Sequence, residues 1–294
     1  MSLPPNHVSL PGSHREPFQS ACSAGARSGD ERLEVTVVLK SPQSTANEEL
    51  LAAQPADRST ARPAPISRAE FAKTYGARVE DVEKVEEFAA EHHLTVVRSD
   101  SVRRSVMLSG TVAQFNAAFG VSLEHFEYDG GTYRGRTGPV TVPTEVADVV
   151  EAVLGLDDRP QAVTHLRQHA GPRSLSPLDV ARLYNVPPKL DGSGQCLALI
   201  ELEGGYRPAD LSTYFHQLGI SPAPIVKAIS VDGAKNAPTG NPDGPDGEVM
   251  LDIEIAGAVA PRATIAVYFA PNTDRGFLDA ITKATHDAQL NPAV

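Results

Sequence analysis

Two acidic residues at helical spacing, Glu248 and Asp252, stand with Glu254 in a largely apolar stretch of this sequence. Residues four apart share one face of an α-helix, about one turn from each other. Like charge and poor solvation raise the pKa of at least one carboxyl in such a pair, and one proton can be shared between them. A pair of this kind can act as a base in acid, where histidine is already protonated.

The pair lies in the segment GPDGEVMLDIEIAGAVAP, residues 244–261. We expect Asp246 to cap the first free amides of a helix that runs from about Glu248 to Val259 and stops at Pro261. The middle of this helix is apolar on all sides, which predicts that most of its surface is buried. The alternative is a helix whose acidic face meets solvent, and the residues alone leave both interpretations open.

The run DGEVMLDIEIAGAVAPRATIAVYFAPNTDRGFLDAIT, residues 246–282, resembles the sedolisins, the serine-carboxyl peptidases, and among them the kumamolisin-like branch. The resemblance implies that Glu248 is the general base towards a serine far downstream, and that Asp252 orients and tunes it. It also implies that Glu201, in the segment IEL, extends the hydrogen-bond chain from these acids. By position, Glu201 ends an apolar strand at the edge where open α/β sheets place their sites. A strand-end carboxylate in water is the alternative.

From Ser176 onward, strands alternate with helices. We expect strands at residues 196–202, 225–231 and 263–270, and helices at residues 208–218, 248–259 and 276–287. This alternation predicts a doubly wound parallel sheet. The resemblance implies a subtilisin-like fold, so residues 176–294 are interpreted as the truncated N-terminal part of a peptidase domain.

The preceding part predicts a different architecture. Its expected order is strand, two helices, two strands, helix, strand and a last short helix at residues 143–154. This order predicts an α+β domain with an antiparallel sheet and helices on one face, close to a ferredoxin-like arrangement. The runs QFNAAFGVSLEHF and GLDDRP resemble those of sedolisin pro-domains. Residues 33–156 are therefore expected to assist folding of the peptidase domain of the same chain and to block its cleft until acid releases it.

Two segments lack apolar periodicity. Residues 1–32 are expected to be a mobile tail, and residues 157–175 a linker that carries the processing site. His165 and His169 in this linker are four apart, but the Glu of an HExxH motif is missing, which argues against a metal site. As these histidines gain charge near about pH 6, contacts between the pro-domain and the peptidase domain are expected to weaken.

Composition excludes several other functions. The net charge of −11 argues against a nucleic-acid surface. No apolar run approaches the length of a membrane span. No ordinary signal peptide is visible, although the resemblance implies a secreted, extracellular protein. Cys22 and Cys196 are the only cysteines, so no disulfide framework is expected.

The leading hypothesis is the precursor of an acid-acting serine-carboxyl endopeptidase with protein or peptide substrates. No serine stands in the Gly-Thr-Ser setting that the family uses. The nucleophile and the ligands of the family's Ca²⁺ are expected downstream of Val294, so these residues alone are expected to hydrolyse nothing.

Two alternatives belong to other classes. A stand-alone pro-domain-like inhibitor or folding helper would need no catalysis. A glycosidase could use Glu248 and Asp252 as its acid and base, but the absence of Trp disfavours sugar stacking.

Overall fold

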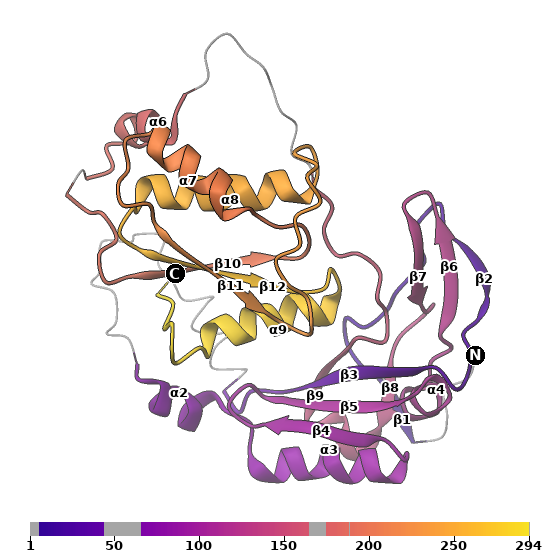
Figure 1. Ribbon diagram of the computed structural model, residues 1–294. Helices are drawn as coiled ribbons and strands as arrows, with labels where there is room; N and C mark the ends of the chain where they lie inside the picture. The colour runs from indigo at the N-terminus through magenta and orange to yellow at the C-terminus, as the bar shows by residue number, and fades with distance from the viewer. Residues whose placement is uncertain (1–5, 44–65, 165–174, 188, 294) are drawn as a thin grey trace. The chain divides into compact units, whose positions relative to one another are not determined.

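The structure is a computed structural model that describes residues 6–43, 66–164, 175–187 and 189–293. The chain divides into two compact units, residues 1–159 and residues 160–294, and each is described by itself (Figure 1). His165 and His169, with most of the expected linker, lie outside the described residues.

The first unit is built on a four-stranded antiparallel sheet in the order β4-β5-β3-β9. Its strands are β3 (Arg32–Leu39), β4 (Thr95–Asp100), β5 (Ser105–Thr111) and β9 (Val150–Leu154). Helix α3 (Val79–Glu91) precedes β4, and α4 (Val112–Phe119) follows β5. Along the chain, these elements follow the strand–helix–strand–strand–helix–strand order of a split βαβ arrangement.

Capping boxes mark where two helices of this unit begin. Ser67 and Glu70 form a capping box at the start of α2 (Arg68–Tyr75). Thr111 caps α4, and Gln114 completes a second capping box. Helix α4 ends at Gly120, whose φ of 59° is left-handed and suits glycine.

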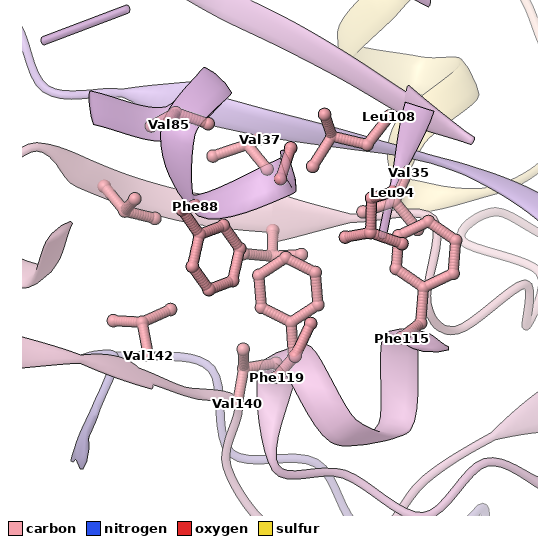
Figure 2. Close-up of a cluster of buried hydrophobic side chains, with 14 of the residues drawn as sticks. Val35, Val37, Val85, Phe88, Leu94, Leu108, Phe115, Phe119, Val140 and Val142 are labelled. Carbon is pink, nitrogen blue, oxygen red and sulfur yellow. The ribbon is translucent and has the colours of Figure 1, made fainter. Parts of the chain in front are cut away.

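One apolar core joins the sheet to α3 and α4 (Figure 2). Phe115 and Phe119 of α4 stack with their ring centroids 6.2 Å apart, and Phe119 lies 5.5 Å from Phe88 of α3. Val35 and Val37 on β3 are fully buried, and because they are two apart they share one face of the strand. Burial of each such side chain contributes about 1.5–3 kcal/mol, so this alternation fixes which face of the sheet meets the helices.

The N-terminal segment differs from the prediction of a mobile tail. Residues 7–9 form β1 (His7–Ser9), which pairs with β8 (Thr141–Pro143). Residues 22–26 form β2 (Cys22–Ala26) in a three-stranded sheet with β6 (Glu124–Tyr128) and β7 (Gly131–Gly135). The partners of both strands lie about a hundred residues or more away, so the local composition carries no sign of them.

The expected late helix over residues 143–154 is also wrong for most of its length. Only α5 (Thr144–Ala147) is helical, and β9 follows it. Val150 and Val153 of β9 are buried beside β3. β-Branched residues pack well on a pleated surface, and this pairing outweighs the helical spacing of the segment.

The second unit holds a parallel three-stranded sheet in the order β10-β12-β11. The strands are β10 (Cys196–Glu201), β11 (Ile225–Ser230) and β12 (Thr264–Phe269). Helices α7 (Pro208–Gln217) and α8 (Pro245–Val259) cover one face, and α9 (Asp274–Thr285) covers the other (Figure 1). The predicted alternation of strands and helices around a parallel sheet is therefore confirmed for this unit.

The helix that opens the second unit is α6 (Pro177–Leu183), which packs beside α8. Ser176 and Asp179 form the capping box at its start.

Cys196 is buried in β10, whereas Cys22 is exposed, and both are free thiols.

Candidate active site

The three parallel strands end together at one edge of the sheet. Glu201, the last residue of β10, and Ser230, the last residue of β11, both pair with Phe269 at the end of β12. Open α/β sheets place their binding sites at this carboxyl edge. A cavity of about 590 Å³ opens there between the loops that follow the strands, with Glu203 and Asn272 in its wall.

Helix α8 begins three residues earlier than expected. Gly244 is its N-cap and gives no side-chain hydrogen bond, so Asp246 lies inside the first turn. The Oδ2 atom of Asp246 accepts hydrogen bonds from Thr239 Oγ1 at 3.0 Å and from the Gly240 amide at 2.6 Å. The prediction that Asp246 caps the helix is wrong. Pro245 is favoured at the first helical position because it has no N–H to satisfy, and Asp246 instead fixes the preceding loop.

The expectation that α8 is buried on most sides is also wrong. Val249 and Ile253 are fully buried on the face that meets the sheet. Glu248 and Asp252, by contrast, are solvent-exposed, and so is Leu251. Only one side of α8 packs against the sheet and α7 within the described residues, so apolar composition alone overstated its burial.

The buried acid of the site is Glu201, which is 5% exposed. Its Oε1 atom has no hydrogen-bond partner among the described residues. Burial first, then the charge of Asp252 and then that of Glu248, raise the pKa of Glu201 to about 8. Glu201 therefore carries a proton at acid and neutral pH, and the alternative of a strand-end carboxylate in water does not hold.

The pKa of Asp252 is raised as well, by partial desolvation first and by the charge of Glu248 second. The three acids singled out in the sequence therefore lie close enough to repel one another, although they come from the end of β10 and from two turns of α8. For Glu201 and Asp252, both burial and the neighbouring negative charges favour the protonated form.

Two further residues, which the sequence did not single out, lie at this edge of the sheet. The Thr164 hydroxyl donates a hydrogen bond to Glu248 Oε2 at 3.0 Å. Asn272 Oδ1 accepts hydrogen bonds from the amides of Gln161 at 2.9 Å and Ala162 at 3.0 Å, and Asn272 Nδ2 donates to the Ala162 carbonyl at 2.8 Å. Asn272 follows the end of β12 closely in the sequence, at the same edge of the sheet as Glu201, and this position is the signal that could have identified it.

The described parts of the chain give no sign of a metal centre or a membrane span. Within them, no group of three or more His, Cys, Asp or Glu side chains is arranged to hold a metal ion. None of the helices there combines the length and the apolar character needed to cross a bilayer.

Both units are similar to known proteins. Residues 20–159 match the family model described as the pro-kumamolisin activation domain. Kumamolisin from Bacillus sp. (strain MN-32) is 47% identical over 298 residues, which cover 97% of this chain and 54% of that protein. Tripeptidyl-peptidase sed5 from Aspergillus fumigatus is 27% identical over 246 residues, which cover 74% of this chain and 42% of that protein.

The chain thus spans about half the length of the curated relatives it matches. The activation-domain match covers most of the first unit, and the similarity to kumamolisin continues through the second unit, which carries Glu201, Glu248 and Asp252. The chain belongs to the sedolisin family, as a kumamolisin-like precursor with a pro-kumamolisin activation domain.

Proposed function

We propose that the whole protein is the precursor of an acid-acting serine-carboxyl endopeptidase whose general base is Glu248. The observation that supports this role most directly is the hydrogen bond from the Thr164 hydroxyl to Glu248 Oε2 at 3.0 Å. An alcohol O–H pointing at a carboxylate oxygen is the geometry that a general base needs towards a serine nucleophile. Glu248 is exposed and can be approached by such a hydroxyl.

In the proposed reaction, a serine from outside these residues attacks the carbonyl carbon of a peptide substrate. Glu248 takes the serine proton as the new bond forms and returns it to the leaving amine, and water then releases the acyl-enzyme. Asp252 supports Glu248 from the next turn of α8. Glu201, which keeps its own proton, is available to donate a hydrogen bond towards these acids. The serine, its oxyanion site and the substrate walls remain expectations from the family resemblance.

Other parts of the proposal follow the same resemblance. The parallel sheet of the second unit is proposed to begin a subtilisin-like domain, and the first unit to associate with that domain before processing. Asp157 and Arg159 are buried in the first unit, so we place the start of the processed linker after Arg159. The described residues offer no cluster suited to Ca²⁺. Secretion is proposed from the resemblance alone.

The test is proteolysis at acid pH by the full-length protein and two variants. Removal of a general base lowers kcat by about 10²–10⁴-fold, so Glu248→Gln is expected to lose activity on this scale. Glu254→Gln, which makes the same chemical change on the same helix, is expected to stay within about threefold of the parent. Undiminished turnover in Glu248→Gln would overturn the proposal. Inhibition of a related peptidase by a catalytically silent full-length protein would favour the inhibitor module instead.

A further inference from the structure

Residues 7–18 form a strap that runs along residues 133–143 of the first unit. The strap begins as β1, which pairs with β8 (Figure 1). Further along, the Arg15 amide donates to the Gly138 carbonyl at 3.1 Å, and the Gly138 amide donates to the Arg15 carbonyl at 2.8 Å. The side chain of Leu10 is buried in the apolar core of the unit. The strap is therefore a folded part of this unit, although it precedes the residues that match the activation-domain model.

Two buried arginines donate hydrogen bonds to carbonyl groups of the strap. Arg136 Nη2 donates to the Ser13 carbonyl at 2.6 Å, and Arg159 Nη1 donates to the Glu16 carbonyl at 2.7 Å. Hydrogen bonds from a charged donor are stronger than those between neutral groups, and a buried charge needs such partners. Opening of the strap would therefore take an acceptor from each of these guanidinium groups.

The strap ends at Phe18, which lies beside Arg159. The guanidinium carbon of Arg159 is 5.2 Å from the ring centroid of Phe18 and 5.0 Å from that of Tyr133 on β7. The two rings are 5.1 Å apart in an edge-on arrangement, and the Phe18 amide donates to the Tyr133 hydroxyl at 3.2 Å. A guanidinium over an aromatic face is attracted by the ring, so Phe18 and Tyr133 together hold Arg159, the last residue of the first unit.

Residues 157–159 belong to no helix or strand, so their position depends on side-chain contacts and on single hydrogen bonds. The Asp158 amide donates to the Arg134 carbonyl at 3.0 Å, and the Arg134 amide donates to Asp158 Oδ1 at 2.6 Å. These bonds tie Asp158 to β7, and the next residue, Arg159, is tied to the strap. The end of the first unit is thus held from two sides by segments that are remote in the sequence.

We propose that the strap controls the accessibility of residues 157–159: while it holds Arg159, these residues stay folded and resist proteolysis, and when it opens they can be cleaved. A protease needs an unfolded stretch of chain, so cleavage is confined to positions downstream of Arg159 while the strap is closed. That the whole protein is processed at such positions rests on the proposed function. The closure of the strap over Arg159 does not depend on it.

The first test measures hydrogen exchange of the Asp158 amide in the full-length protein. Phe18→Ala removes a ring that packs on Arg159, so exchange is expected to become about tenfold faster or more. Phe18→Leu keeps an apolar side chain but no aromatic face, and is expected to give a smaller increase. His14→Ala is the matched control on the strap, because His14 makes only an exposed pair with Glu16, and it is expected to change exchange by less than about twofold. The amides of β3 should keep their protection in all three variants.

The second test uses an added protease that cleaves on the amino side of aspartate, with the fragments identified by mass. In Phe18→Ala, cleavage before Asp157 and Asp158 is expected to become several-fold faster than in wild type. Cleavage before Asp129, which is exposed in the turn between β6 and β7, is the internal reference and should not change. Arg159→Lys keeps the charge but loses the planar set of donors, so it should produce the same increase with Phe18 intact.

Exchange of the Asp158 amide at the wild-type rate in Phe18→Ala would overturn the inference. Equal acceleration at Asp158 and at the β3 amides in Phe18→Leu would also overturn it, because the strap would then only support the unit as a whole. Neither result touches the dependence of activity on Glu248. Full activity of Glu248→Gln would instead remove the proposed function and leave the accessibility of residues 157–159 unaffected, so the two failures are distinguishable.

Discussion

Arg159 and Asp157 form a buried ion pair at the end of the first unit, with Nε 2.8 Å from Oδ1 and Nη2 2.6 Å from Oδ2. Arg159 also donates from Nη1 to the Glu16 carbonyl at 2.7 Å, and its guanidinium lies 5.2 Å from the ring centroid of Phe18 and 5.0 Å from that of Tyr133. Both charged residues were expected in a polar linker. Their partners come from remote parts of the chain, so residues 157–159 are part of the folded first unit.

Arg159→Ala is expected to lower the free energy of unfolding of the first unit by about 3–5 kcal/mol, because it leaves the Asp157 carboxylate buried without its partner. Urea unfolding of the full chain, monitored through hydrogen exchange of the β3 amides, measures this loss. Lys84→Ala, which breaks the exposed pair with Asp148, is the control and is expected to cost less than about 1 kcal/mol. Equal losses in the two variants would contradict the account of the buried pair.

Glu201→Gln is expected to change how stability depends on pH. Glu201 holds its proton up to about pH 8 in the folded protein, whereas an unfolded glutamate loses it near about pH 4.3. Protonation of Glu201 therefore contributes its full stabilisation of the folded state below about pH 4. This contribution to the free energy of unfolding is lost as the pH rises through the pKa of Glu201 in the folded protein. Gln cannot ionise, so thermal unfolding should show the variant close to wild type at about pH 4 and more stable at about pH 9. A constant difference across this range would refute the assignment.

Asp279→Asn is expected to act in the same direction at lower pH. Burial first, and then the charge of Asp232, raise the pKa of Asp279 to about 6, although Arg275 lies 3.4 Å away and partly offsets the shift. Stability contributed by the protonated form is present below about pH 4 and is lost as the pH rises through 6. The variant should gain on the order of 2 kcal/mol over wild type at about pH 7 and nothing at about pH 4. Asp243→Asn, at an exposed position, is the control in the same thermal assay and should show no such trend.

Gly257→Ala tests how closely α8 packs on α7. A Cβ atom added at Gly257 would lie 2.5 Å from the ring of Phe215. Ala gains about 1 kcal/mol of helix propensity over Gly, but overpacking typically costs about 1–3 kcal/mol, so a net loss of stability is expected. Combining the change with Phe215→Leu relieves the overlap. Chemical unfolding should therefore show that the double variant loses less than the two single losses added together.

Much of the fold follows from short-range signals. Ser67, Thr111 and Ser176 each mark a helix start with a capping residue, and the structure has a helix at each. Alternation along β3 and the apolar runs of β10 and β12 predict these strands with small errors at their ends. These features depend on contacts within a few residues, which is why the sequence shows them directly.

The remaining differences arise from contacts between distant segments. Strand β2 is recognisable only through its pairing with β6, and β9 only through its pairing with β3. At the site, the spacing of Glu248 and Asp252 identifies the acidic face of α8 but not its exposure, which depends on what packs beside the helix. Thr164 and Glu248 are 84 positions apart in the sequence, and no pattern within a few residues predicts their contact.

The order of the parallel sheet has a consequence for how the protein emerges from the ribosome. Its central strand, β12, is the last of the three to be synthesised, while β10 and β11 touch only β12 and not each other. Neither β10 nor β11 can pair with β12 until residues 264–269 have been translated, whereas every strand described in the first unit has been synthesised once Leu154 is made. Domains fold from the N-terminus as they are synthesised. The activation domain can therefore be folded before the second unit has its central strand, β12.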